Sequence, residues 1–181
     1  MKRPFPLLLL CFTMAGLSTD AQNFSKTGVL KVSMRNSGPL MQNEKVRGYY
    51  YFYRVEKQDR KNDNYLLSIH DENLRQVNSV TITRPTSYIL VDGVFNGSVF
   101  GFMFFDTRGE TLELLTYDKS LKQVGQAFNK VENRFAKMTY SMLAQQPESS
   151  QAFLVPIENK GFIHYGFTEK GCAFVFKYPA K

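Results

Sequence analysis

The sequence contains no tryptophan, and only two histidines and two cysteines occur among its 181 residues. The usual Cys/His pattern of a zinc site is therefore missing. Cys11 lies in the N-terminal leader described below, so Cys172 would stand alone in the mature chain and an internal disulfide is excluded. The apolar run around Cys172 favours a small buried side chain over a reactive thiol.

Blocks of one charge are also missing, although Lys and Arg (23) outnumber Asp and Glu (16) and give a net charge of +7. The basic residues alternate with acidic ones, as in the segment 56–63, which contains Glu56, Lys57, Asp59, Arg60, Lys61 and Asp63. This mixture is typical of a solvated loop rather than of a nucleic-acid-binding patch, so no nucleic-acid partner is expected.

Residues 1–21 have the three regions of a secretory signal peptide. Lys2 and Arg3 form a positive start, an apolar run follows, and the segment ends in small or polar residues. Thr19 and Ala21 suit the small subsites of signal peptidase, so we expect cleavage between Ala21 and Gln22. The apolar run is too short for a permanent anchor. The mature chain is therefore expected to be secreted or periplasmic, with no membrane span after cleavage.

An internal repeat is the main structural clue. Residues 65–77 and 112–124 share a strand-like apolar run followed by Asp-x-x-Leu, a basic residue, Gln and Val, at an offset of 47 residues. Asp71 corresponds to Asp118 and Leu74 to Leu121. In such a turn the aspartate accepts backbone N–H groups ahead of it, so we interpret these four residues as structural. A period of about 45 residues is typical of one four-stranded propeller blade.

Aromatic segments precede both copies, Gly48–Val55 before the first and Gly101–Asp106 before the second. A third partial copy follows from Ala152, with the aromatic segment Gly161–Phe167. Continuous aromatic runs indicate strands buried on both faces. The pairs Asp92-Gly93 and Asn96-Gly97 favour tight turns. Helical spacing occurs at 135–144, and strands are predicted near 28–34, 48–56, 64–70, 76–83, 87–95, 98–106, 111–117, 122–130, 151–157, 161–167 and 172–178.

These patterns predict an all-β domain over residues 22–181, built from antiparallel four-stranded blade-like repeats. The repeats amount to about 2.75 blades, fewer than the 4–8 of a closed ring. We therefore expect a partial or open β-propeller whose last repeat is incomplete at the C-terminus. A β-sandwich-like stack of sheets is the alternative. The unpaired edges of such sheets would allow self-association.

The export signal, the aromatic strands and the Asp-x-x-Leu hairpins together resemble a family of secreted bacterial β-propeller-like repeat proteins of unknown function. The resemblance covers residues 24–181 and implies no catalytic activity.

No constellation for chemistry emerges from the residue pattern. His70 and His164 lie in predicted strands and are interpreted as structural. Asp92, Asp106, Glu110 and Glu113 are close in sequence, but all are expected in turns or on solvated strand faces. No catalytic residue, metal site or cofactor is predicted. The expected function is an exported, non-catalytic binding or interaction module for an unknown protein or glycan ligand. A carbohydrate-active enzyme, or a fragment of one, is the alternative.

Overall fold

The computed structural model describes residues 27, 29, 36–42, 44–57, 59–143, 153–167 and 173–179. The predicted signal peptide with its Ala21–Gln22 junction and Cys172 lie outside these residues. The elements in chain order are β1 (Ser37–Gln42), β2 (Lys45–Lys57), β3 (Asn62–His70), β4 (Gln76–Pro85), β5 (Tyr88–Phe95), β6 (Val99–Asp106), β7 (Thr111–Asp118), β8 (Gln123–Lys130), α1 (Arg134–Leu143), β9 (Leu154–Ile157), β10 (Gly161–Phe167) and β11 (Ala173–Pro179).

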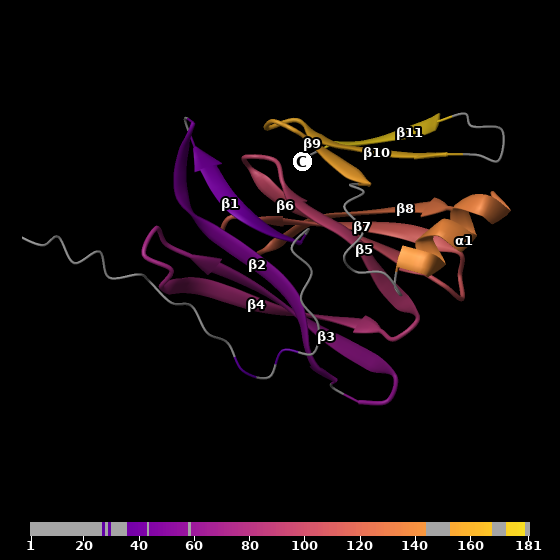
Figure 1. Cartoon of the computed structure of the whole chain (residues 1–181), viewed down its shortest axis with the longest axis horizontal. Helices are drawn as coiled ribbons and strands as arrows, with labels where there is room; N and C mark the ends of the chain where they lie inside the picture. The colour runs from indigo at the N-terminus through magenta and orange to yellow at the C-terminus, as the bar shows by residue number, and fades with distance from the viewer. Residues whose placement is uncertain are drawn as a thin grey trace, which may run out of the picture.

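The strands form three antiparallel sheets, each of which pairs strands that follow one another in sequence. We call β1-β2-β3-β4 sheet A, β5-β6-β7-β8 sheet B and β11-β10-β9 sheet C. Figure 1 shows sheet B between the other two, with α1 at one end of the molecule. The described chain is thus mostly antiparallel β, and sheets A and B have the predicted four strands.

The strand predictions agree with the structure within a few residues from β2 to β11, and α1 coincides with the predicted helical spacing. Sequence reasoning missed β1, whose segment Ser37–Gln42 contains Gly38 and Pro39 and has little β propensity. The strand predicted at 28–34 lies outside the described residues except for Val29, which is not in a strand.

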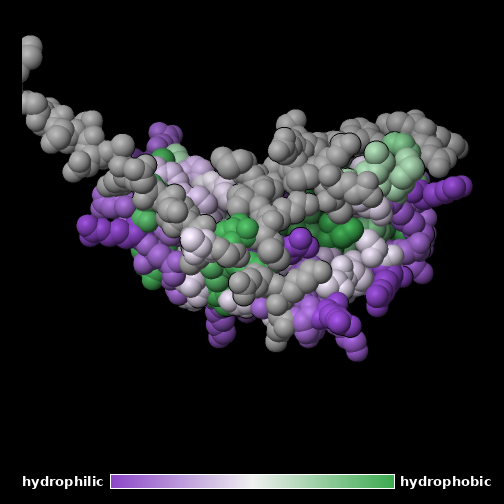
Figure 2. All heavy atoms as spheres, turned by 60° about the horizontal axis from the view of Figure 1, so that its bottom comes forward, coloured by the Kyte–Doolittle hydropathy of each residue, from purple (hydrophilic) through white to green (hydrophobic). Residues whose placement is uncertain are grey.

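Both faces of β6 are buried, because side chains alternate across a strand. Phe100, Phe102 and Phe104 pack against sheet A, while Met103 and Phe105 pack against sheet C and α1. All five are at most 1% exposed. The continuous aromatic run of β6 is therefore the seam between two hydrophobic cores, one on each face of the strand. On the molecular surface in Figure 2, hydrophilic side chains gather mainly along the rim of the face and hydrophobic ones toward its middle.

Aromatic stacking and a close glycine contact join the sheets at this seam. The rings of Phe52 in sheet A and Phe102 in sheet B are stacked with centroids 3.9 Å apart. On the opposite face of β6, a Cβ at Gly101 would lie 2.8 Å from the ring of Phe162 in sheet C. The absence of a side chain at Gly101 thus lets the buried Phe162 ring approach the backbone of sheet B.

The two Asp-x-x-Leu segments form the β3–β4 and β7–β8 turns and have matching geometry. The Oδ1 atom of Asp71 accepts backbone N–H groups from Asn73 (2.9 Å) and Arg75 (2.8 Å). Leu74 has a φ of 57° in this turn.

In the second turn, Asp118 Oδ1 accepts N–H groups from Ser120 (2.9 Å) and Lys122 (3.0 Å), and Leu121 has a φ of 65°. The Ser120 hydroxyl also donates to this carboxylate, and it lowers the pKa of Asp118. The carboxylates thus hold both turns in a conformation with one left-handed leucine.

The tight turn predicted at Asp92-Gly93 is wrong. Both residues lie inside β5, where the pairing with β6 shifts register between Leu90 and Asp92. Such a shift marks a β-bulge, which can re-aim a side chain while the strand continues. The pair Asn96-Gly97 does form the turn to β6, and Gly97 has a φ of 98°.

Candidate functional site

A small hollow lies where three chain segments meet: β1, the turn from β5 to β6, and the turn from β9 to β10. Its volume is about 240 Å³, below the range of about 300–1,000 Å³ that is usual for small-molecule sites. The hollow therefore suits a single large side chain better than a cofactor. It is lined by Pro39, Met41, Phe95, Asn96, Gly97, Pro156 and Glu158.

Hydrogen bonds between the two turns fix one wall of the hollow. The backbone N–H of Asn159 donates to the carbonyl of Asn96 (2.9 Å), and the Ser98 hydroxyl donates to Asn159 Oδ1 (2.5 Å). The side chain of Asn96 also bonds within the protein, because its Oδ1 accepts from the N–H groups of Ser98 and Val99 and its amide nitrogen donates to the Gly161 carbonyl. This wall therefore has few hydrogen-bonding groups left for a ligand.

Phe95 forms a rigid apolar side of the hollow. Its ring packs against Phe100 with centroids 4.7 Å apart and against Tyr50 with centroids 6.5 Å apart. The Nζ atom of Lys119 lies 5.6 Å from the centroid of the Phe95 ring. Met41 and Glu158 also line the hollow, and both are exposed, Met41 to 45%. The hollow thus combines apolar walls with one carboxylate among the described residues that line it.

The acidic residues singled out in the sequence are held in structural contacts. Asp92 and Glu113 were expected in turns or on solvated faces, but both are only 1% exposed, so this prediction is wrong. Asp92 Oδ2 accepts the backbone N–H groups of Phe153 (2.7 Å) and Leu154 (3.0 Å). The carboxylate of Asp92 thereby joins β5 of sheet B to the start of β9 in sheet C.

The buried Glu113 on β7 forms an ion pair with the partly buried Arg84 on β4 and accepts a hydrogen bond from Gln126 Nε2 (2.5 Å). The Arg84 guanidinium carbon also lies 4.8 Å from the Tyr88 ring centroid and 5.6 Å from that of Phe104. Burial lowers the pKa of Arg84. The pair links the outermost strand of sheet A to sheet B.

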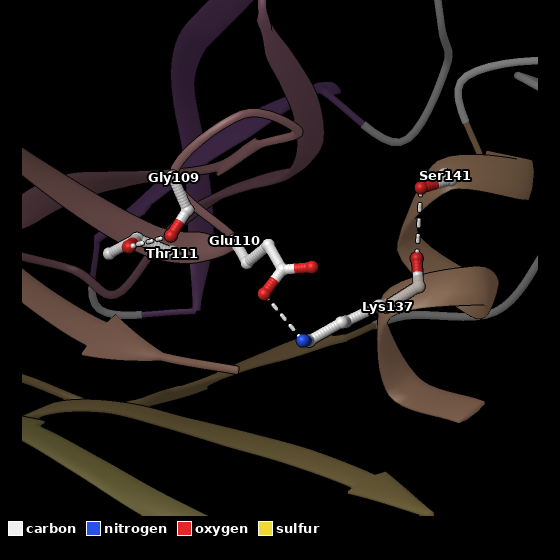
Figure 3. A network of polar contacts seen from close by, with 5 residues as sticks. All are labelled: Gly109, Glu110, Thr111, Lys137 and Ser141. Carbon is white, nitrogen blue, oxygen red and sulfur yellow. Dashed lines mark hydrogen bonds and ion pairs between the residues drawn. The ribbon is translucent and has the colours of Figure 1, made fainter. Parts of the chain in front are cut away.

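The other two candidate carboxylates belong to the β6–β7 turn. Asp106 accepts N–H groups from Arg108 (3.1 Å) and Gly109 (3.0 Å) within that turn. Glu110 receives a hydrogen bond of 2.5 Å from Lys137 Nζ, which attaches α1 to the turn (Figure 3). The four carboxylates therefore do not converge on the hollow.

Both histidines are buried and hydrogen-bonded at both ring nitrogens. His70 Nε2 lies 2.7 Å from Ser68 Oγ and its Nδ1 lies 3.0 Å from the Leu74 carbonyl. A carbonyl oxygen only accepts, so Nδ1 carries the proton that it donates to Leu74. This Ser–His contact is 1% exposed at both residues, and it supports the β3–β4 turn from inside.

Within the described residues no cluster of three or more His, Cys, Asp or Glu side chains has the arrangement of a metal site. The helix in the described part of the chain is not long and apolar enough to cross a membrane.

A protein-family model matches residues 1–178, and its description is a family of unknown function, DUF6770. The chain belongs to this family. No curated protein and no solved structure matches it. The matched range covers residues 1–21, for which the sequence predicts a leader, and all three sheets except Pro179 at the end of β11.

Sequence reasoning about this DUF6770 chain missed the hollow and the burial of Asp92. Pro39, Met41 and Pro156 are far apart in sequence and carry no local signal for a shared site. Asp92 did offer a signal, since it interrupts the apolar run Ile89–Phe95 within a predicted strand. A carboxylate in such a run is either exposed or bound by several donors, and only the fold distinguishes the two.

We expect the burial of His164 to make the stability of the DUF6770 chain depend on pH. Its ring is 0% exposed, Nδ1 donates to the Phe153 carbonyl (2.9 Å), and the Tyr140 hydroxyl donates to Nε2 (2.7 Å). Burial lowers the pKa of His164. The unfolded chain therefore binds a proton as the pH falls through about 6.5, while the folded chain resists it.

The stability that neutral His164 contributes is complete above about pH 6.5 and is lost as the pH falls below it, by at most about 1.4 kcal/mol per pH unit. Urea unfolding at about pH 7.5 and about pH 5.5 measures this change. The variant His164→Gln cannot titrate, so we expect its free energy of unfolding to fall less over the same interval. An equal loss of free energy of unfolding in the natural chain and in His164→Gln would contradict the assignment of this pH dependence to His164.

Proposed function

We propose that the chain is an exported, non-catalytic binding module that holds an apolar side chain of a protein partner in the hollow between β1, β5 and β9. The observation that carries this proposal is the composition of the hollow. Pro39, Met41, Phe95 and Pro156 supply its walls, while the polar atoms of Asn96 are already bonded within the protein.

The residues that line the hollow also favour a protein ligand over a glycan. Sugar rings bring many hydroxyl groups, and each one needs a partner when water is removed. Among the described residues that line this hollow, the exposed Glu158 supplies the one charged side chain, and Lys119 lies beside the Phe95 ring. An apolar side chain with a basic neighbour would meet both the walls and the carboxylate. A glycosidase would require two carboxyl groups that face each other, and the four carboxylates considered above are engaged elsewhere.

The order of the strands supports a propeller-like interpretation of the fold. The first strands of the sheets are neighbours, since β1 contacts β5 and β5 contacts β9. In a propeller the first strands of the blades line the central axis, and ligands commonly bind beside it. The hollow lies beside these first strands. We therefore place the binding surface at the axis of a partial propeller-like stack.

The test uses the chain exported from a secreting host, whose N-terminal residue is read by mass spectrometry and is expected to be Gln22. This protein is applied to arrays of immobilised peptides and of oligosaccharides. We expect binding to peptides that carry an apolar residue next to a basic one. Met41→Glu places a charge in the hollow and should weaken that binding at least about tenfold.

Met138→Glu is the matched control, because Met138 is similarly exposed (52% against 45% for Met41) but lies on α1 outside the hollow. Its binding should equal that of the natural chain. Equal losses for both variants, or binding confined to oligosaccharides, would contradict the proposed site. Hydrolysis of any arrayed ligand would contradict the non-catalytic role.

A further inference from the structure

The outer strand of sheet A has the composition of a pairing edge. β4 bonds to β3 on one side and is the last strand in the order of sheet A. Residues 76–83 contain no charge and no proline, and five of the eight are β-branched. Proteins usually protect an exposed edge with charges, prolines or bulges. In β4 a register shift near Gln76 and the terminal Pro85 protect the two ends, while the stretch from Asn78 to Thr83 has no such protection.

The backbone of β4 directs its free hydrogen-bonding groups outward at alternate residues. The Thr86 N–H donates to the Lys61 carbonyl, so even-numbered positions at this end of the strand face β3. Ser79 N–H instead donates to the side chain of Asn78 (2.8 Å), which places odd-numbered positions on the outer edge. Thr81 and Thr83 therefore offer their N–H and carbonyl groups to a further strand, and Ser79 offers its carbonyl, while its N–H is held by Asn78. All three side chains are exposed.

We propose that β4 pairs antiparallel with β4 of a second copy of this chain, about a two-fold axis at Thr81. In that register Thr81 faces Thr81 of the second copy, and Ser79 faces Thr83 in both directions. These are the residues whose backbone groups point outward, so the Thr81 pair exchanges both backbone hydrogen bonds. Each Ser79–Thr83 pair does the same once the Ser79 N–H exchanges the Asn78 side chain for the Thr83 carbonyl of the second copy. On the side facing sheet B, Val80 meets Ile82 of the second copy and extends the apolar layer that both residues join.

Charge favours a second copy as the occupant. Each chain carries a net charge of +7, so most of its surfaces would repel an identical surface. The seam proposed here has no charged residue between Gln76 and Thr83, and the next residue, Arg84, faces the neutral Asn78 of the second copy. Hydroxyl and β-branched side chains directly opposite each other stabilise antiparallel pairs. The strand is thus self-complementary without any like-charge contact.

Other edges are less suited to this pairing. β1 contains Pro39 and β9 contains Pro156, and a proline removes a donor from an edge. β8 contains Gly125 and ends at Lys130, and β11 contains Lys177 and Pro179. β5 contacts both β1 and β9. Because a two-fold axis uses the same edge of both copies, the assembly closes as a dimer instead of growing into a filament. The result is a continuous antiparallel sheet made of both copies of sheet A.

Sedimentation of the mature chain over a range of concentrations tests the pairing, and we expect a monomer–dimer equilibrium. Because Ser79 faces Thr83 of the second copy, the double variant Ser79→Lys/Thr83→Lys puts like charges opposite each other twice. It should raise the dimer dissociation constant at least about tenfold. Ser79→Glu/Thr83→Glu should do the same, which controls for the sign of the added charge.

The charge-swapped variant Ser79→Lys/Thr83→Glu places opposite charges together and should keep the dimer. The proposal would be overturned if the natural chain stays monomeric. It would also be overturned if the charge-swapped variant dimerises as weakly as the two like-charge variants. An independent measurement uses Thr81→Cys in a chain with Cys172→Ala, which a short bifunctional maleimide should cross-link. Phe128→Cys on β8 is the control, and cross-linking of both at the same rate would also overturn the pairing.

Discussion

Replacing Asp92 with alanine is expected to lower the free energy of unfolding by about 3–5 kcal/mol. Its carboxylate accepts the buried N–H groups of Phe153 and Leu154, and also the N–H of Gly93 (2.8 Å). Each buried donor left without a partner costs about 1–3 kcal/mol, and bonds to a charged acceptor lie at the upper end of that range. Urea unfolding followed by circular dichroism measures the total loss.

The part of the fold that loses stability in Asp92→Ala distinguishes a specific link between sheets B and C from a general effect on folding. Asp92 joins sheet B to the first strand of sheet C, so hydrogen exchange in Asp92→Ala should rise first at Phe153, Leu154 and the β10 amides. Exchange in β3 of sheet A should change least under native conditions. Asp92→Asn retains one acceptor oxygen in nearly the same volume, and we expect a smaller loss. Uniform exchange across all three sheets would contradict a specific link to sheet C.

Replacing Glu113 with alanine is expected to destabilise the chain by about 3–5 kcal/mol. Glu113 is 1% exposed, and the Arg84 side chain with which it pairs is 17% exposed. Without Glu113, the Arg84 guanidinium stays close to the rings of Tyr88 and Phe104 as a partly buried charge that no carboxylate neutralises. The midpoint of urea unfolding measures the effect. Because the ion pair connects β4 of sheet A with β7 of sheet B, we expect Glu113→Ala to weaken the packing of the two sheets against each other.

The matched control removes both charges. The double variant Arg84→Met/Glu113→Leu leaves no orphaned ion and retains similar volumes, so we expect stability within about 1–2 kcal/mol of the natural chain. Its single parents should each be clearly less stable than the double variant. A double variant that loses as much as the sum of the two single losses would show that Arg84 and Glu113 act independently, which contradicts the ion pair.

The strands themselves were predictable because their signals are local. Alternating or continuous apolar residues with polar breaks define β2, β3, β6 and β7, and the Asp-x-x-Leu segments specify their own turns through bonds within five residues. β1 was missed because Gly38 and Pro39 weaken its propensity, and pairing with β2 stabilises it instead. Asp92-Gly93 was mistaken for a turn because the pair has turn chemistry, while the pairing of β5 with β6 absorbs it as a bulge.

The sequence alone determined the mostly antiparallel β class, the near-final positions of most strands, and the repeated turn built on Asp71 and Asp118. These depend on side-chain alternation and on bonds between close neighbours in the chain. The tertiary structure alone decided that Asp92 and Glu113 are buried and that distant turns enclose a hollow. Those outcomes depend on contacts such as Asp92 with Phe153, which lie 61 residues apart and have no counterpart in local composition. A buried carboxylate and a solvated one look alike until the sheet that covers it is in place.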